Sequence, residues 1–191
     1  MKQSASQTVG PFFRIGLIYG PAQNNLVKEQ TSGERITLTG IVYDGDGEPI
    51  PDALIEIWQP DANGIFNHPL DPLHGQADPN FRGFGRAENR NGGKYEFKTI
   101  KPGARDGMPP YINVHILARG MLIHAITRIY FSDEPANAED PVLNAVDPER
   151  RHTLIASRAH KFKIVVVRKL QRPLISKITK IYTLDYITLL H

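Results

Sequence analysis

The 191-residue sequence contains no cysteine. This absence excludes disulfides, thiolate nucleophiles and cysteine-ligated metal centres, so any metal would need oxygen or nitrogen ligands. The sequence also lacks an apolar run near the roughly 20 residues that span a bilayer, and it lacks a basic start followed by an apolar stretch. We therefore expect a soluble, cytoplasmic protein with no membrane or nucleic-acid partner, and the length suits one domain.

Acidic residues and glycine are scarce toward the C-terminus. Residues 150–191 contain 10 Lys and Arg against one Asp or Glu, a net charge of +9, whereas residues 1–149 contain 13 against 19, a net charge of −6. All 16 glycines lie at or before Gly120. The chain thus consists of a turn-rich, acidic part and a basic tail.

Motifs for nucleotide binding, serine hydrolysis and zinc peptidase chemistry are absent: there is no G-x-x-x-x-G-K-[ST], G-x-S-x-G or H-E-x-x-H. The sequence has β-rich runs instead. "RITLTGIVYDGDGEPIPDALIEIW" predicts two strands joined as a hairpin by the turn-forming "DGDGEP". "KYEFKTIKPG", "YINVHILARG" and "LIHAITRIYFSDE" predict further strands, and five or six strands at this spacing are typical of a β-sandwich.

Two segments fall outside this β pattern. The first 22 or so residues mix Gly, Pro and Ser with apolar pairs and show no lasting period, which predicts an extended arm on a surface, either of this chain or of another subunit. "DPVLNAVDPERRHTLIAS" offers Asp and Asn as helix caps, and it is the one place where short helices are expected. The prediction is an all-β fold with an N-terminal arm and little helix.

Tyrosine, histidine, aspartate and glutamate are the remaining candidate metal ligands. In "PPYINVH", Tyr111 and His115 share one face of a strand but lie about 13 Å apart at Cα, too far to hold one ion, and the residue between them on that face is Asn113. Both fit better as half-buried strand residues. His68 and His74 lie in a polar loop and are expected to be solvated, and His124 is expected within a strand.

Arg119 in "LARG" follows an apolar strand. A guanidinium at a rigid strand end suits a carboxylate ligand, which it can grip through two hydrogen bonds. An ordinary surface arginine with a favourable neighbour explains the same pattern equally well. "GFGR" at residues 83–86 indicates a turn or a close backbone approach rather than a nucleotide site.

Several motifs together resemble the intradiol ring-cleaving dioxygenases. They are "LTGIVYDGDGEPIPDALIEIWQPDANGIF", "DPNFRGFGR", "YEFKTIKPG" and "RIYFSDEPANAEDPVLN", in that order. "SQTVGP", "LARG" and "EDPVLN" are similar to the alpha chains of the two-subunit members. The resemblance covers about residues 4–158 and implies a prealbumin-like β-sandwich, with Fe(III) held by two tyrosines and two histidines.

The resemblance also implies that this chain has lost the iron ligands. The first tyrosine position falls on Phe66 and the second on Arg105, and the histidine pair falls on Tyr111 and Asn113, or on Asn113 and His115 in a shifted frame. No catalytic residue and no metal ligand is then expected in this chain. Fe(III) would be held by an iron-bearing beta subunit, and this chain would act as its partner.

The activity implied by the resemblance is intradiol cleavage of protocatechuate by O₂ to 3-carboxy-cis,cis-muconate, in aromatic catabolism. In such a pair the alpha chain lines the mouth of the iron pocket. Thr8, Gly10, Pro11 and Arg119 match the residues that border the substrate there.

The sequence suggests three regions: an arm and linker (1–35), the dioxygenase-like sandwich (36–158) and an atypical basic tail (159–191). The match ends near residue 159, which suggests a shifted reading frame or a replaced terminus, and a lost last strand would leave a sheet edge exposed. A basic amphipathic segment for an anionic surface is the alternative for the tail.

Two other functions remain open at this point. A β-sandwich alone does not determine function, so a non-enzymatic, prealbumin-like binding module is one alternative. The other is a self-sufficient dioxygenase that uses Tyr43, Tyr95 or Tyr130 as unconventional iron ligands.

Overall fold

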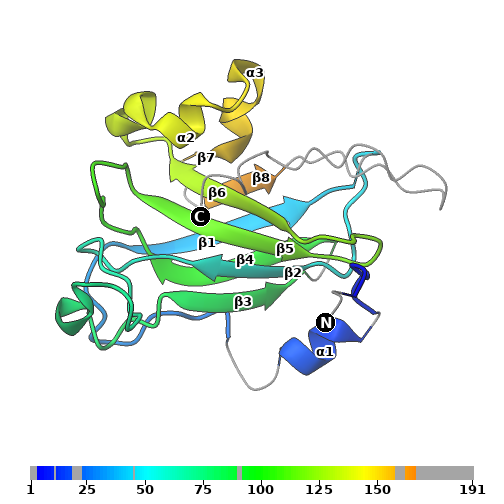
Figure 1. Cartoon of the computed structure of the whole chain (residues 1–191), viewed down its shortest axis with the longest axis horizontal. Coiled ribbons are helices and arrows are strands. Elements are labelled where there is room, and N and C mark those ends of the chain that lie inside the picture. The colour runs from blue at the N-terminus through cyan, green and yellow to red at the C-terminus, as the bar shows by residue number, and fades with distance from the viewer. Residues whose placement is uncertain are drawn as a thin grey trace.

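The computed structural model describes residues 4–10, 12–18, 23–44, 46–89, 92–157 and 162–166. Eight strands in this part of the chain form two sheets, one in the order β4-β1-β8 and the other in the order β3-β2-β5-β6-β7 (Figure 1). The predicted β-sandwich with little helix is confirmed. The strands are β1 Arg35–Val42, β2 Leu54–Trp58, β3 Phe84–Glu88, β4 Lys94–Ile100, β5 Tyr111–Leu117, β6 Ala125–Phe131, β7 Ile155–Ala156 and β8 Phe162–Val166.

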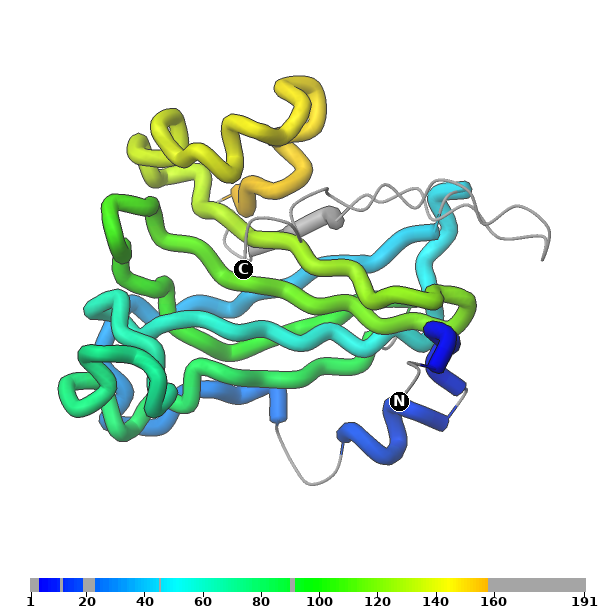
Figure 2. Tube along the Cα trace, viewed as in Figure 1, coloured from blue at the N-terminus to red at the C-terminus, as the bar shows by residue number. Residues whose placement is uncertain are grey.

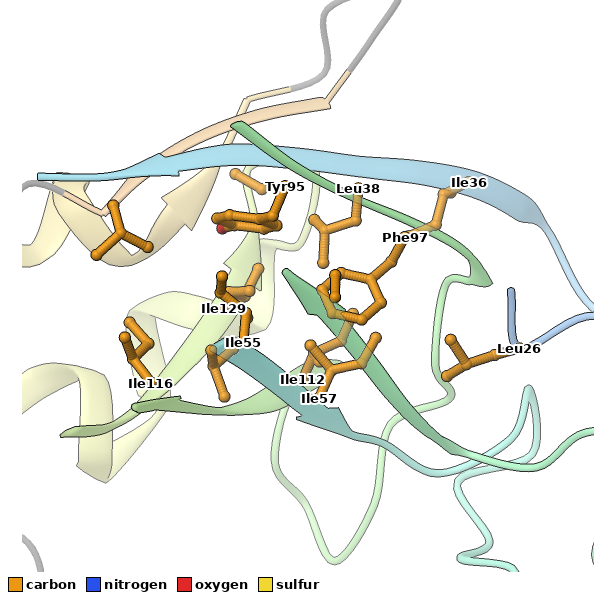
Figure 3. Packing of buried hydrophobic residues seen from close by; sticks show 14 of the residues in the cluster. Leu26, Ile36, Leu38, Ile55, Ile57, Tyr95, Phe97, Ile112, Ile116 and Ile129 are labelled. Carbon is orange, nitrogen blue, oxygen red and sulfur yellow. The ribbon is translucent and has the colours of Figure 1, made fainter. Parts of the chain in front are cut away.

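Alternating side chains explain why these segments form strands that bury one face. β1 reads RITLTGIV with every second residue buried, and β5 alternates in the same way. Figure 3 shows the buried side chains of the two sheets facing one another, with Leu38 and Phe97 on one side and Ile57 and Ile112 on the other. All four are essentially inaccessible to water, so the core lies between the sheets.

The predicted hairpin between β1 and β2 is wrong. β1 pairs with β4 and β8, whereas β2 pairs with β3 and β5 in the other sheet. The turn itself forms, because the Asp44 carboxylate accepts the backbone N–H groups of Asp46 and Glu48, both at 2.9 Å. Pro49 and Pro51 follow, and since proline has no N–H to donate, the chain leaves the first sheet and enters the second.

The N-terminal arm is extended only in part. Residues Phe13–Leu17 form the short helix α1, which the sequence did not predict. Arg14 lies 3.6 Å from the carboxylate of Glu88 at the end of β3, so the helix contacts that end of the sheet. Phe12 and Ile15 are 73% and 65% exposed, and the arm therefore presents large apolar side chains to its surroundings.

The tail predicted to begin at residue 159 contains a strand. β8 runs parallel to β1, from the pair Leu38 and Phe162 to the pair Val42 and Val166. A strand therefore covers the edge of β1 that a lost terminus would leave open. The remaining residues of the tail lie outside the described residues.

The predicted helices form where aspartate caps them. Asp140 accepts the N–H of Leu143 at the start of α2 (Pro141–Asn144), and Asp147 accepts that of Glu149 at the start of α3 (Pro148–Arg151). Figure 2 shows this region at the opposite end of the sandwich from α1. The short 3₁₀ helices are η1 His74–Gln76, η2 Pro135–Glu139 and η3 His152–Leu154. Within the described ranges, no helix has the length and apolarity needed to cross a membrane.

Candidate functional site

The candidate site lies on the outer face of the five-stranded sheet. Strand register places Phe84, Trp58, Asn113 and Arg128 in one row across β3, β2, β5 and β6. All four are half-buried, since this face is turned away from the core. Aromatic and cationic side chains thus meet on one surface.

Phe66 and Arg105, two of the positions implied for lost iron ligands, lie together beside this row. The Phe66 ring stacks on Trp58 with ring centroids 5.5 Å apart and planes 19° apart. The Arg105 guanidinium lies over the same Phe66 ring, with its Cζ 5.4 Å from the ring centroid. A carbon ring and a cation therefore occupy two positions for which the resemblance implies iron-binding tyrosines.

Arg105 is neutralised by Asp71, a residue that the sequence did not single out. Arg105 Nη1 donates to Asp71 Oδ2 and also to the carbonyl of Gly64, the latter at 3.0 Å. Asp71 further accepts the backbone N–H groups of Phe66 and Leu73, each at 2.9 Å. The ion pair joins the loop after β2 to the turn after β4.

A second buried carboxylate shapes the same loop. Asp61 is 2% exposed and accepts three backbone N–H groups, from Asn63, Ile65 and Asp78, at 2.9 to 3.0 Å. The N–H of Gly103 donates to the Asp61 carbonyl at 2.9 Å, so the turn after β4 is held against the loop. These contacts fix the positions of Phe66 and Arg105.

The Asp71–Arg105 ion pair predicts a specific acid sensitivity. Hydrogen bonding from Arg105 is the largest influence on the Asp71 carboxyl and lowers its pKa to about 2. A carboxyl with a folded pKa below its unfolded value of about 3.9 stabilises the fold above pH 4, and this contribution is lost as the pH falls toward 2. We expect the free energy of unfolding to fall as the pH is lowered from 4 to 2. In Arg105→Gln it should fall less steeply, because the residue that lowers the Asp71 pKa is gone.

Urea denaturation at several pH values between 2 and 5 measures this difference. Arg150→Gln is the matched control, because it removes an exposed arginine outside the ion pair and should keep the original pH slope. If Arg105→Gln and the unmodified chain showed equal slopes, Asp71 would not be coupled to Arg105.

Tyr111 and Asn113, the other implied ligand positions, point to the same outer face from β5. The Arg128 guanidinium lies directly over the Tyr111 ring, with its Cζ 4.0 Å from the centroid. Asn113 lies between Trp58 and Arg128 in the row. Both Tyr111 and His115 are half-buried strand residues, as predicted.

The four histidines considered in the sequence analysis divide into two groups. His115 in β5 stacks on His124, with centroids 5.3 Å and planes 29° apart. Burial lowers the pKa of His115, and the neighbouring His124 lowers it further. His124 is exposed and precedes β6, so its prediction as a strand residue is wrong. His68 and His74 are exposed in their loop, as predicted.

The structure brings Thr8 close to Arg119. The Thr8 Oγ1 accepts the N–H of Gly120 at 2.8 Å, which places the arm beside the turn between β5 and β6 (Figure 2). Arg119 is 53% exposed and its Nε is paired with the Asp52 carboxylate. Gly10 is exposed. Pro11 lies outside the described residues.

The residues present do not fit a ferric ion. Neither the Arg105 guanidinium nor the Phe66 ring has an atom that can ligate a cation, and Tyr111 lies under the Arg128 guanidinium. Across the described ranges, no group of three or more His, Asp or Glu side chains is arranged to hold a metal ion. Burial raises the pKa of Tyr95 and of Tyr130, which opposes the tyrosinate form that iron requires.

A family model described as Dioxygenase matches residues 9–169. The chain belongs to this family, that of the intradiol dioxygenases. From the motifs alone, the resemblance was predicted to end near residue 158. The family match extends to residue 169, so that predicted end is too early.

Among its relatives is the protocatechuate 3,4-dioxygenase alpha chain of Burkholderia cepacia, which is 43% identical over 171 residues and covers 83% of this chain and 85% of the relative. The beta chain of the same enzyme from B. cepacia is 34% identical over 149 residues, covering 72% of this chain and 63% of the beta chain. An intradiol ring-cleavage dioxygenase from Tetranychus urticae has the same fold, with a TM-score of 0.59, 21% identity and coverage of 88% and 96%.

Sequence reasoning missed Asp71, Trp58 and Arg128 as parts of the site. An aspartate in a Pro- and Asp-rich loop looks like any turn residue, and its arginine partner is 34 positions away. Strand alternation could have placed Trp58 and Arg128 on the outer face with Asn113. That these side chains lie in one row depends on the order of the strands in the sheet, and this order cannot be predicted from alternation alone.

Proposed function

We propose that this chain is the alpha-type subunit of a protocatechuate 3,4-dioxygenase and that it acts with a beta subunit holding Fe(III). The observation that carries the proposal is the 43% identity to an alpha chain over most of both sequences. The isolated chain is inactive in this view. The expectation of a cytoplasmic location stays a prediction.

The geometry of the outer face supports a chain without iron. Arg105, held by Asp71 and lying on Phe66, puts a cation between the loop and the turn that would otherwise supply ligands. Because Asp71 is already paired with this guanidinium, a ferric ion would have to displace Arg105 to reach the carboxylate. The partner subunit is therefore the better place for the metal.

Large exposed apolar side chains support an assembly. Phe12 and Ile15 on the arm are well exposed, and Leu122 and Ile123 in the turn after β5 are 41% and 52% exposed. Such side chains on a water-facing surface are typical of a site covered by another protein. We infer that the arm and this turn border the beta subunit.

The proposed pocket contribution comes from Thr8, Gly10, Pro11 and Arg119. Thr8 is hydrogen-bonded to the turn that carries Arg119, so the arm and the arginine form one unit. The Nε of Arg119 is used by Asp52, whereas its terminal nitrogens remain able to bind the carboxylate of protocatechuate. The iron supplies Lewis acidity toward the ring hydroxyls, and O₂ is the second substrate.

Co-expression tests this proposal. The full chain, the beta subunit and the co-expressed pair are each assayed for protocatechuate-dependent O₂ uptake and for co-purification through a tag on one chain. We expect the pair to co-purify and to be active, and the full chain alone to be inactive. Activity of the chain alone, or failure to bind the beta subunit, would contradict the proposal, and the latter would favour a non-enzymatic binding module.

A further inference from the structure

Helix α1 is too short to be held by its own hydrogen bonds. It spans five residues, has no capping side chain and buries none of its residues. Isolated helices shorter than about 12 residues are marginal in water, because the ordering of the first turn costs more free energy than its hydrogen bond offsets. Contacts outside the helix must therefore hold it in place.

The arm is attached to the sandwich before, within and after α1. Thr8 is hydrogen-bonded to the turn after β5. Arg14 in the helix is paired with Glu88 at the end of β3, at 3.6 Å between Nη1 and Oε2. The carbonyl of Gln23 then accepts the N–H of Arg86 in β3 at 3.1 Å. The free chain therefore carries α1 against the end of β3 (Figure 1).

The two sides of α1 differ in exposure. Phe13 and Leu17, one turn apart, are half-buried. Phe12 and Ile15, which flank the start of the helix three positions apart, are 73% and 65% exposed. Gly16 is exposed as well, and nothing lies within 4 Å of the place where its Cβ would stand. The outward side of α1 (Phe12, Ile15 and Gly16) thus has two large apolar side chains beside a bare backbone, which another chain can approach closely.

We propose that the outward side of α1 is a preformed docking element that enters an apolar groove of the beta subunit, a role that rests on the proposed function. The Arg14–Glu88 ion pair positions the helix for this contact. The beta subunit is the occupant because α1 belongs to the arm that Thr8 joins to the turn with the exposed Leu122 and Ile123, so the apolar surface is continuous with the one proposed to border that subunit. A helix already in place loses little conformational freedom on binding.

The affinity of the full chain for the beta subunit, measured by isothermal titration calorimetry, tests the docking role. Phe12→Ala should raise the Kd by about tenfold or more, because aromatic anchors dominate the energetics of interfaces. Gly16→Glu places a charge on the outward side without a clash inside the chain, and should raise the Kd at least as much. Leu70→Ala is the matched control: Leu70 is 87% exposed but lies in the loop before β3, whereas α1 contacts the other end of that strand. Its Kd should stay unchanged.

Trypsin cleavage after Arg14 tests the ion pair in the free chain, without a beta subunit. Glu88→Gln keeps the cleavage site and removes the charge that holds Arg14. We expect release of residues 1–14, followed by mass spectrometry, to be about two- to fivefold faster than in the unmodified chain, and the Kd for the beta subunit to rise by a similar factor. Glu139→Gln removes an exposed carboxylate away from the arm and should change neither.

The outcomes separate this docking role from the proposed function. If the unmodified pair forms and the folded Phe12→Ala and Gly16→Glu variants bind equally well, the docking role is overturned and the proposed function stands. If the unmodified chain does not bind the beta subunit, both are overturned. Equal cleavage rates in Glu88→Gln and the unmodified chain would show that the ion pair does not position α1. Self-association of the free chain that Phe12→Ala abolishes would assign α1 to a contact between copies of this chain instead.

Discussion

Replacing Gly64 with alanine is expected to lower the thermal unfolding midpoint by more than about 5 °C. Gly64 has φ +79°, and a Cβ on it would overlap the carbonyl oxygen of Ala104 in the facing turn. The left-handed conformation alone costs a side chain about 1–3 kcal/mol. The overlap adds to this, because the loop and the turn meet through their backbones and neither can move without breaking the contacts of Asp61 and Arg105.

Gly107→Ala separates the two effects. Gly107 has φ +76°, nearly the same conformation, but nothing lies within 4 Å of the place where a Cβ would stand. We expect Gly107→Ala to lower the midpoint by the conformational cost only, and Gly64→Ala to lower it further. Thermal unfolding followed by circular dichroism measures both, and equal losses would mean that the contact between the loop and the turn does not hold the fold.

Arg119→Ala in the assembled pair is expected to reduce kcat/KM for protocatechuate by about 10- to 100-fold, while catechol is affected little. A charge-assisted hydrogen bond contributes about 1.5–3 kcal/mol, and only the carboxylated substrate can form it. Steady-state O₂ uptake with both substrates gives the two ratios. Iron content should stay the same, since Arg119 is no metal ligand.

Asp52→Asn is the matched variant for Arg119. It keeps the guanidinium but removes the carboxylate that holds the Arg119 Nε. We expect a smaller loss than in Arg119→Ala, because the charge remains while its orientation loosens. Equal losses for protocatechuate and catechol in Arg119→Ala would instead assign Arg119 to the interface or to the shape of the pocket.

The strands could be predicted because alternation is a local property. KYEFKTI and YINVHIL have a buried residue at every second position, and both are strands almost where expected. The caps Asp140 and Asp147 are local too, and their helices form. Pairing is not local, which is why the β1–β2 hairpin was wrong: the prolines after the turn send the chain to the other sheet.

In the site, too, the residues that belong to sequence motifs could be predicted, whereas contacts between distant residues could not. The resemblance predicted that Phe66 and Arg105 replace iron ligands, and the structure places them in contact. The compensating charge on Asp71 could not be predicted, because a loop carboxylate gives no sign of which distant cation it will meet. Helix α1 was missed since five residues without a capping side chain leave no clear signal.

The most direct test of this account is the iron content of the full chain purified without a beta subunit. Elemental analysis and visible absorption should be measured on the chain alone and on the co-expressed pair. The account predicts no stoichiometric iron and no tyrosinate-to-iron band for the chain alone, and about one iron per pair for the assembly. A red-brown chain with one iron per molecule would contradict it, because Phe66 and Arg105 would then not have removed the metal site.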